Sequence, residues 1–198
     1  EREITVQPAD SAVPEQEIQT PFNPALIKVD TEQMPIYHAL RLIEQKRIVL
    51  DPEFQRNFIW DNARQSRLIE SILLRIPLPA FYLDATRENT YLVVDGLQRL
   101  STLDRFCNQK AFGLTGLSYL KDLEGKRFDE LPVSMQTTIT ERTKLTVYTI
   151  LPETPPQVKF LIFHRVNTGG LALTSQEIRH ALYQGPATRL LKQLAGEQ

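Results

Sequence analysis

Apolar residues recur at helical spacing in two segments of the first half of the chain. From residue 35 to residue 46, every third or fourth position is apolar, which predicts a helix with Pro35 in its first turn. A second helix is predicted over residues 62–75, where Asp61 is suited to cap the first turn. Its apolar stripe is predicted to face the core, while three of its charged residues face elsewhere: Arg64, Arg67 and Glu70.

Runs of β-branched and alternating residues predict the strands of the domain. Strands are expected at residues 48–50, 80–84, 90–94 and 144–151. Further helices are expected at residues 97–108 and 133–142, and after two capping boxes that begin at Thr154 and Thr174. Helices and strands alternate without a regular βαβ rhythm, which indicates an α+β domain with a small mixed sheet and flanking helices.

Composition along the chain suggests three parts. Residues 1–25 contain four prolines and mostly acidic charges without a sustained period, so we expect an extended or disordered lead-in. Residues 26–152 are expected to form the core domain. Residues 153–198 are expected to form a helical extension that packs on that core.

The charge balance excludes some classes of protein. The 198 residues include 23 basic and 24 acidic side chains, a net charge of −1, so a protein that coats nucleic acid through a uniformly positive surface is excluded. The basic residues are 15 arginines and 8 lysines. Because arginine binds phosphate and carboxylate groups through a planar fork, the positions of the arginines matter more than their total.

Other classes are excluded by missing features. No apolar run has the roughly 18–20 residues that a membrane-spanning helix needs. Because residues 1–5 lack the pattern of an export signal, we expect none. The single cysteine, Cys107, cannot form an internal disulfide, so a cytoplasmic protein with Cys107 as a buried thiol is expected. Three widely spaced histidines without a cysteine cluster argue against a structural zinc site.

The strongest local motif is a strand that runs into Asp95-Gly96 and then directly into a helix. Glycine permits a sharp turn, and the first amides of the helix form an anion site together with the helix dipole. Arg99 could add a charged fork to a phosphate, and Asp95 could hold a hydrated Mg²⁺. Alternatively, Asp95 only caps the helix and Arg99 only pairs with a carboxylate.

Two further segments are rich in polar and aromatic residues. In the loop at residues 52–60, Gln55 and Arg56 could face a ligand, and Trp60 could stack on a base or simply belong to the core. In the segment at residues 164–170, polar residues and glycine amides could line a phosphate or sugar, or merely end a helix. The residues of this third group are Asn167, Thr168 and Gly169.

In this order, the three segments resemble the N-terminal domain of the GmrSD type of bacterial restriction systems, which is related to ParB and sulfiredoxin. The family hallmark, Asp-Gly-Gln-Gln-Arg followed by Leu/Ile-Thr, corresponds to residues 95–102. The upstream motif is matched by Pro52, Phe54, Gln55, Arg56, Phe58 and Trp60, followed by residues 69–73, Pro77 and Pro79. The downstream motif is matched by Phe163, Val166, Asn167, Thr168, Gly169, Leu173, Thr174, Glu177 and Ile178.

The resemblance implies a ParB/sulfiredoxin-like fold that binds a nucleoside triphosphate, and hydrolyses it, in a system that acts on foreign DNA. Catalytic roles would fall to Asp95, Gln98 and Arg99, with Asp95 assisting Mg²⁺. Phosphate or nucleotide contacts would come from Gln55, Arg56, Gly96, Arg99, Ser101, Thr102, Asn167, Thr168 and Gly169. Sulfiredoxin chemistry is not implied, because it needs a cysteine in the turn and Cys107 lies well beyond Gly96.

The resemblance also implies partners. DNA is expected to be bound directly or through a partner, and the nuclease is expected in a C-terminal domain or a separate subunit; homo-oligomerisation is left open. One departure matters, because Leu97 replaces the first glutamine of the hallmark. The alternatives to an active triphosphatase are therefore a non-catalytic nucleotide- or DNA-sensing module that controls a nuclease, and an interaction domain whose site is inactive.

Overall fold

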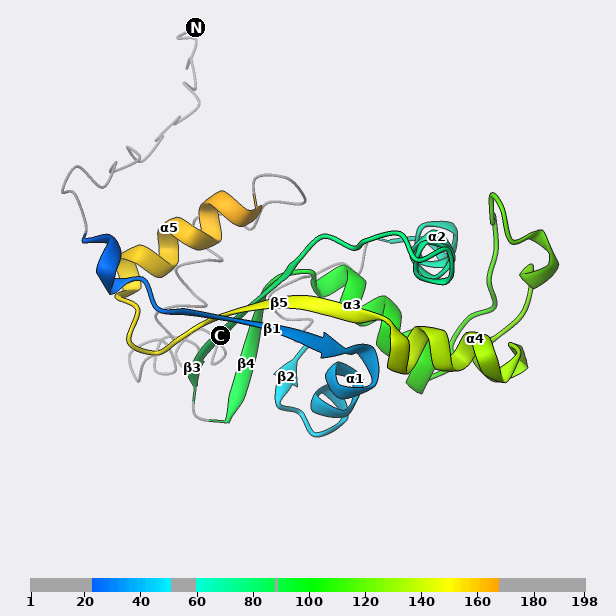
Figure 1. Cartoon of the computed structure of the whole chain (residues 1–198), viewed down its shortest axis with the longest axis horizontal. Helices are drawn as coiled ribbons and strands as arrows, with labels where there is room; N and C mark the ends of the chain where they lie inside the picture. Colours follow the sequence, from blue (N-terminus) through cyan, green and yellow to red (C-terminus); the bar gives the residue numbers. More distant parts are fainter. Residues whose placement is uncertain (1–22, 51–59, 88, 168–198) are drawn as a thin grey trace, which may run out of the picture.

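The computed structural model describes residues 23–50, 60–87 and 89–167, in which five strands form one mixed sheet flanked by helices (Figure 1). The strands are β1 (Val29–Pro35), β2 (Ile48–Val49), β3 (Phe81–Arg87), β4 (Thr90–Asp95) and β5 (Lys144–Ile150). The helices are α1 (Ile36–Glu44), α2 (Asn62–Leu73), α3 (Leu97–Leu103), α4 (Val133–Thr137) and α5 (Pro156–Asn167). The expected α+β class is confirmed.

The strand order across the sheet is β1-β5-β3-β4-β2. β1 pairs antiparallel with β5, and β3 pairs antiparallel with β4. The two remaining ladders, β3 with β5 and β2 with β4, are parallel. The hairpin β3–β4 therefore occupies the middle of the sheet, and the end of β4 delivers the chain directly into α3.

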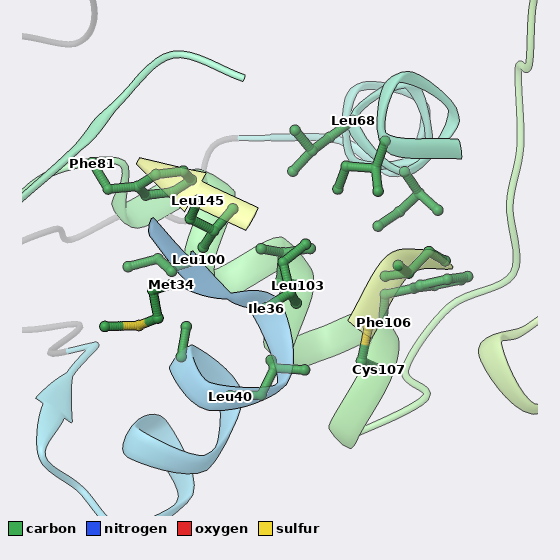
Figure 2. Close-up of a cluster of buried hydrophobic side chains, with 14 of the residues drawn as sticks. Met34, Ile36, Leu40, Leu68, Phe81, Leu100, Leu103, Phe106, Cys107 and Leu145 are labelled. Atoms are coloured by element: carbon green, nitrogen blue, oxygen red, sulfur yellow. The ribbon is translucent and has the colours of Figure 1, made fainter. Parts of the chain in front are cut away.

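Side chains of β3 alternate between the two faces of the sheet. Phe81 and Leu83 belong to the main hydrophobic core, whereas Tyr82 packs with the smaller cluster of Val94 and Phe163. Figure 2 shows the main core, with Phe81 near Leu100 of α3 and Leu145 of β5. The smaller cluster lies between the sheet and α5, so the two faces of the sheet are covered by different helices.

Local signals set most helix boundaries as expected. Asp61 caps α2, because its Oδ1 accepts a hydrogen bond of 2.7 Å from the Arg64 amide. α1 begins directly after Pro35. The predicted helix at residues 97–108 comprises α3 and a π-helical turn at residues 104–108, and the one at residues 133–142 comprises α4 and a similar turn.

Glu70 departs from the expected orientation. We expected it to face away from the core, but it is buried, with 4% of its surface exposed. Its carboxylate accepts hydrogen bonds of 2.7–3.0 Å from the amides of Ser118, Tyr119 and Leu120. The expectation was wrong because these partners lie about fifty residues further along the chain, beyond any local pattern.

Two further differences concern strands. β1 was not expected, because its residues are mostly polar and exposed and only Met34 is buried. β3 continues to Arg87, past the expected end at Asp84. The helix expected after Thr174 and nearly all of the expected lead-in lie outside the described residues, and the division into three parts stays a prediction.

Candidate functional site

The turn between β4 and α3 requires glycine for two physical reasons. Gly96 has φ +97°, in the left-handed region that side chains with a Cβ rarely adopt. A Cβ built on Gly96 would also lie 2.4 Å from Cδ1 of Phe81. The backbone therefore packs directly on the Phe81 ring, and β4 can lead into α3 without a spacer.

The first turn of α3 has no side-chain cap. The amide of Leu100 donates to the carbonyl of Gly96 at 2.8 Å and so starts the helical hydrogen bonds. The amides that precede it point toward the start of the helix, where the helix dipole places partial positive charge. The geometry thus suits an anion in front of Gly96, and anion binding there stays a prediction.

The Arg99 side chain is buried and forms an internal brace. Its guanidinium donates to the carbonyls of Pro79 and Ala80, the latter at 3.0 Å, and to Asp95 Oδ2 at 2.9 Å. It also lies 4.2 Å from the centroid of the Phe81 ring. Burial lowers the pKa of Arg99, and Asp95 opposes that shift; the group remains a cation at neutral pH.

This brace uses three of the five N–H donors of Arg99. The ion pair with Asp95 is the carboxylate pairing that the alternative expected of Arg99, whereas the helix cap that it expected of Asp95 is absent. Two donors remain for another acceptor. A role of Arg99 toward phosphate stays a prediction, and it would have to be added to the structural role.

Asp95 is the part of the turn that reaches solvent, with 34% of its side chain exposed. One oxygen, Oδ2, accepts from Arg99. Within the described ranges, no three His, Cys, Asp or Glu side chains lie together as a metal cluster. Asp95 therefore suits Mg²⁺ only where one carboxylate oxygen is joined by water and ligand phosphates, which is a common arrangement for this ion.

The remaining motif residues of α3 differ in their access to solvent. Ser101 and Gln98 are half-buried. Thr102 is fully buried, and its hydroxyl donates to the carbonyl of Gln98 at 2.7 Å. The Thr102 hydroxyl is therefore used inside the helix, whereas Ser101 lies closer to the surface.

Trp60 is half-buried against the main core, and the guanidinium of Arg64 lies 4.7 Å from the centroid of its ring. The core alternative for Trp60 is thus consistent with its packing, and stacking on a base stays a prediction. Several predicted residues cannot be placed. Gln55, Arg56, Thr168, Gly169 and the side chain of Asn167 lie outside the described part of the chain.

A buried ion pair is a further feature that the sequence did not reveal. Lys159 of α5 contacts Asp84 of β3 at 3.1 Å, and both side chains are almost fully buried. The two residues are 75 positions apart, so no local spacing could have indicated the pair. The ion pair holds α5 against β3, the strand that also contains Phe81.

Two further observations concern membrane association and the single cysteine. No helix within the described ranges is long and apolar enough to cross a membrane. Cys107 is buried, and burial raises the pKa of its thiol to about 12, with a further contribution from Asp104. The expected buried structural thiol is consistent with both facts.

Comparison with known proteins identifies one relationship. The family model described as the N-terminal domain of the GmrSD restriction endonuclease matches residues 39–184. No match is found among curated proteins or among solved structures. The matched range includes the turn at Gly96, the Trp60 region and the end of α5.

Proposed function

Because this chain belongs to the family of GmrSD restriction endonuclease N-terminal domains and is thus a restriction-system component, we propose that it binds and hydrolyses a nucleoside triphosphate. In this proposal it is the sensor or effector domain of a bacterial defence system against phage that acts on foreign DNA. The observation that carries the proposal is the turn at Gly96, where the half-buried strand β4 ends directly at an uncapped helix start. Such a start attracts phosphate through backbone amides and the helix dipole.

In this proposal each residue around the turn has its own role in binding or hydrolysis of the nucleotide. The amides after Gly96 would hold phosphate oxygens, and the hydroxyl of Ser101 would add a donor. Asp95 would supply one oxygen to a Mg²⁺ that arrives with the nucleotide, which neutralises charge during phosphoryl transfer. Gln98 would orient the attacking water. The Arg99 brace would keep Asp95 and the turn in place.

A second candidate is a module that binds nucleotide without turning it over. It is favoured by the brace, which uses most donors of Arg99 inside the protein. It is also favoured by Leu97, which is apolar where the family hallmark has glutamine. In this case, nucleotide binding would control a partner nuclease.

The test is a calorimetric titration of the full chain with the four ribonucleoside triphosphates, with and without Mg²⁺, followed by a phosphate-release assay. We expect binding of at least one nucleotide, weakened by Ser101→Ala and unchanged by the control Ser134→Ala, which lies on the exposed side of α4. Absence of binding for all four nucleotides would contradict both candidates and favour an inactive site.

One substitution separates the two candidates. Leu97→Gln restores the residue of the family hallmark without touching the brace. If the glutamine orients water, this variant should release phosphate faster than the natural chain while its nucleotide affinity stays similar. If neither chain releases phosphate although both bind nucleotide, the module without turnover is correct.

A further inference from the structure

The outer face of α2 carries a row of positive charge. Arg64, Arg67 and Ser71 are three or four residues apart and share one side of the helix, and Arg75 follows at its end. All three arginines are exposed. The acid within the helix, Glu70, is buried and engaged with backbone amides, so no carboxylate of the helix body offsets this row.

The row leads into a pocket of about 510 Å³ at the end of α2. Arg75, Arg142 and Lys144 line it, together with the hydroxyl-bearing Thr138 and Thr143. Within the described residues, no acidic side chain lines this pocket. In the view of Figure 1, α2 lies on the right and α5 on the left.

In the described part of the protein, the positive side chains of this pocket are not accompanied by negative ones. Glu141 is next to Arg142 in the chain but lines a different pocket with Arg41 and Glu44. Among the described residues, the ion pairs are Asp95–Arg99, Asp129–Lys110 and Asp84–Lys159. The cations of the α2 pocket therefore have no acidic partner in the part of the chain that the structure describes.

Arg75 occupies a backbone position at which glycine is preferred. It has φ +60° and closes α2, since its amide donates to Ile72 O and the amide of Ile76 donates to Ser71 O. This two-bond ending is the Schellman motif, in which the left-handed residue is usually glycine. The local backbone thus gives no reason for an arginine here.

We propose that the outer face of α2 and this pocket bind the sugar-phosphate backbone of double-stranded DNA. From Arg64 to Arg75 the helix advances by about 16 Å, and one DNA strand presents a phosphate roughly every 3.4 Å, so the face spans several consecutive phosphates. Arginine forks suit phosphate oxygens. Backbone contacts position a protein on DNA without reading its sequence.

The choice of DNA among polyanions rests on the proposed function, because the family is one of restriction endonucleases. The pocket shares no lining residue with the turn at Gly96, so each site can be changed without substituting a residue of the other. The inference assigns α2 to positioning on DNA and leaves nucleotide binding to the start of α3.

The chain offers a matched pair of variants. Lys46 closes α1 in the same way as Arg75 closes α2: it has φ +56°, its amide donates to Ile43 O, and the amide of Arg47 donates to Leu42 O. Arg75→Gly and Lys46→Gly each remove one exposed positive charge from a left-handed helix end. Both should leave Tm unchanged or raise it, because glycine relieves the same backbone strain.

The assay is fluorescence anisotropy of a labelled random-sequence DNA duplex with the full chain over a series of salt concentrations. Arg75→Gly should weaken binding about fivefold at 0.15 M salt and lower the salt slope by about 0.9, the effect of one lost phosphate contact. Lys46→Gly should bind as the natural chain does. A second variant, Arg142→Gln, should repeat the loss.

Several outcomes would overturn the inference. Equal binding by Arg75→Gly and Lys46→Gly would place the contact elsewhere, and a flat salt response would exclude phosphate contacts. Equal competition by an acidic polypeptide would assign the surface to a protein partner, and stronger binding of RNA would assign it to RNA. Nucleotide titration of Arg75→Gly should match the natural chain, so failure of nucleotide binding in both would contradict the proposed function alone.

Discussion

Replacement of Arg99 by alanine tests whether the family arginine is mainly a brace or mainly a phosphate ligand. In the structure, the guanidinium joins the end of β4 to the segment that follows α2, through Asp95 and the carbonyls of Pro79 and Ala80. It also covers the Phe81 ring at 4.2 Å. Arg99→Ala removes all of these contacts at once, so its effect on stability can be worked out before any ligand is considered.

The expected loss in unfolding free energy is about 3 kcal/mol. Hydrogen bonds that involve a charged group contribute roughly 1.5–3 kcal/mol each, and a partly desolvated cation–π contact adds about 1 kcal/mol. At their lower values these contributions amount to about 5.5 kcal/mol. The expected loss is smaller because Asp95 is one-third exposed and Pro79 is exposed, so water can replace part of the lost partners. Urea unfolding with both chains at neutral pH measures the difference.

Two variants calibrate this result. Arg67→Ala removes an exposed arginine of α2 and should change stability by less than about 0.5 kcal/mol. A double-mutant cycle with Asp95→Ala should give a coupling of roughly 1 kcal/mol, since that carboxylate is partly solvated. A loss below about 1 kcal/mol for Arg99→Ala, with an unchanged denaturant slope, would refute the brace and point to an arginine that turns outward.

Three further predictions concern the turn, the buried acid and the thiol. Gly96→Ala should destabilise the fold by about 2–4 kcal/mol in urea, because the new Cβ meets the Phe81 ring in a left-handed backbone. Burial acts to raise the pKa of Glu70, but three backbone N–H groups hold the pKa below its ordinary value. The stability that the folded protein gains from these hydrogen bonds to the Glu70 carboxylate is complete above the pKa of the unfolded chain, about 4.3. It is lost as pH falls through the lower pKa of Glu70 in the folded protein. Glu70→Gln should therefore lower stability by about 2 kcal/mol at neutral pH and flatten its acid dependence; an unchanged profile would contradict this. Native Cys107 should react with iodoacetamide far more slowly than the unfolded chain, as mass spectrometry would show, because the pKa of its thiol is about 12.

Much of the fold could be predicted because its signals are local. The cap at Asp61 and the apolar spacing of α1 need only a few neighbouring residues, and each element lies where its pattern indicated. β1 could not be predicted because an exposed edge strand with a single buried residue has no apolar alternation. It is recognisable only through its pairing with β5, more than a hundred residues away.

In the candidate site, too, the features with a local sequence signal could be predicted and those that depend on distant residues could not. The sequence predicted the Asp95-Gly96 turn and the helix start, because strand, glycine and helix are adjacent in the chain. It left open where the Arg99 fork points, and the structure assigns three donors to internal partners. Two of those partners, Pro79 and Ala80, are about twenty residues away, so the motif alone could not distinguish a brace from a ligand.

Glu70 connects the stability of the fold with the charge of its surface. A carboxylate at this position would normally balance the arginines of α2 on the outside of the helix. Here the loop at residues 118–120 needs an acceptor for three amides, and Glu70 is turned inward to supply it. The outer face of α2 is left with arginines and no acid of its own. A chain with a net charge of −1 can therefore present a locally basic surface, because one of its acids is used inside the fold.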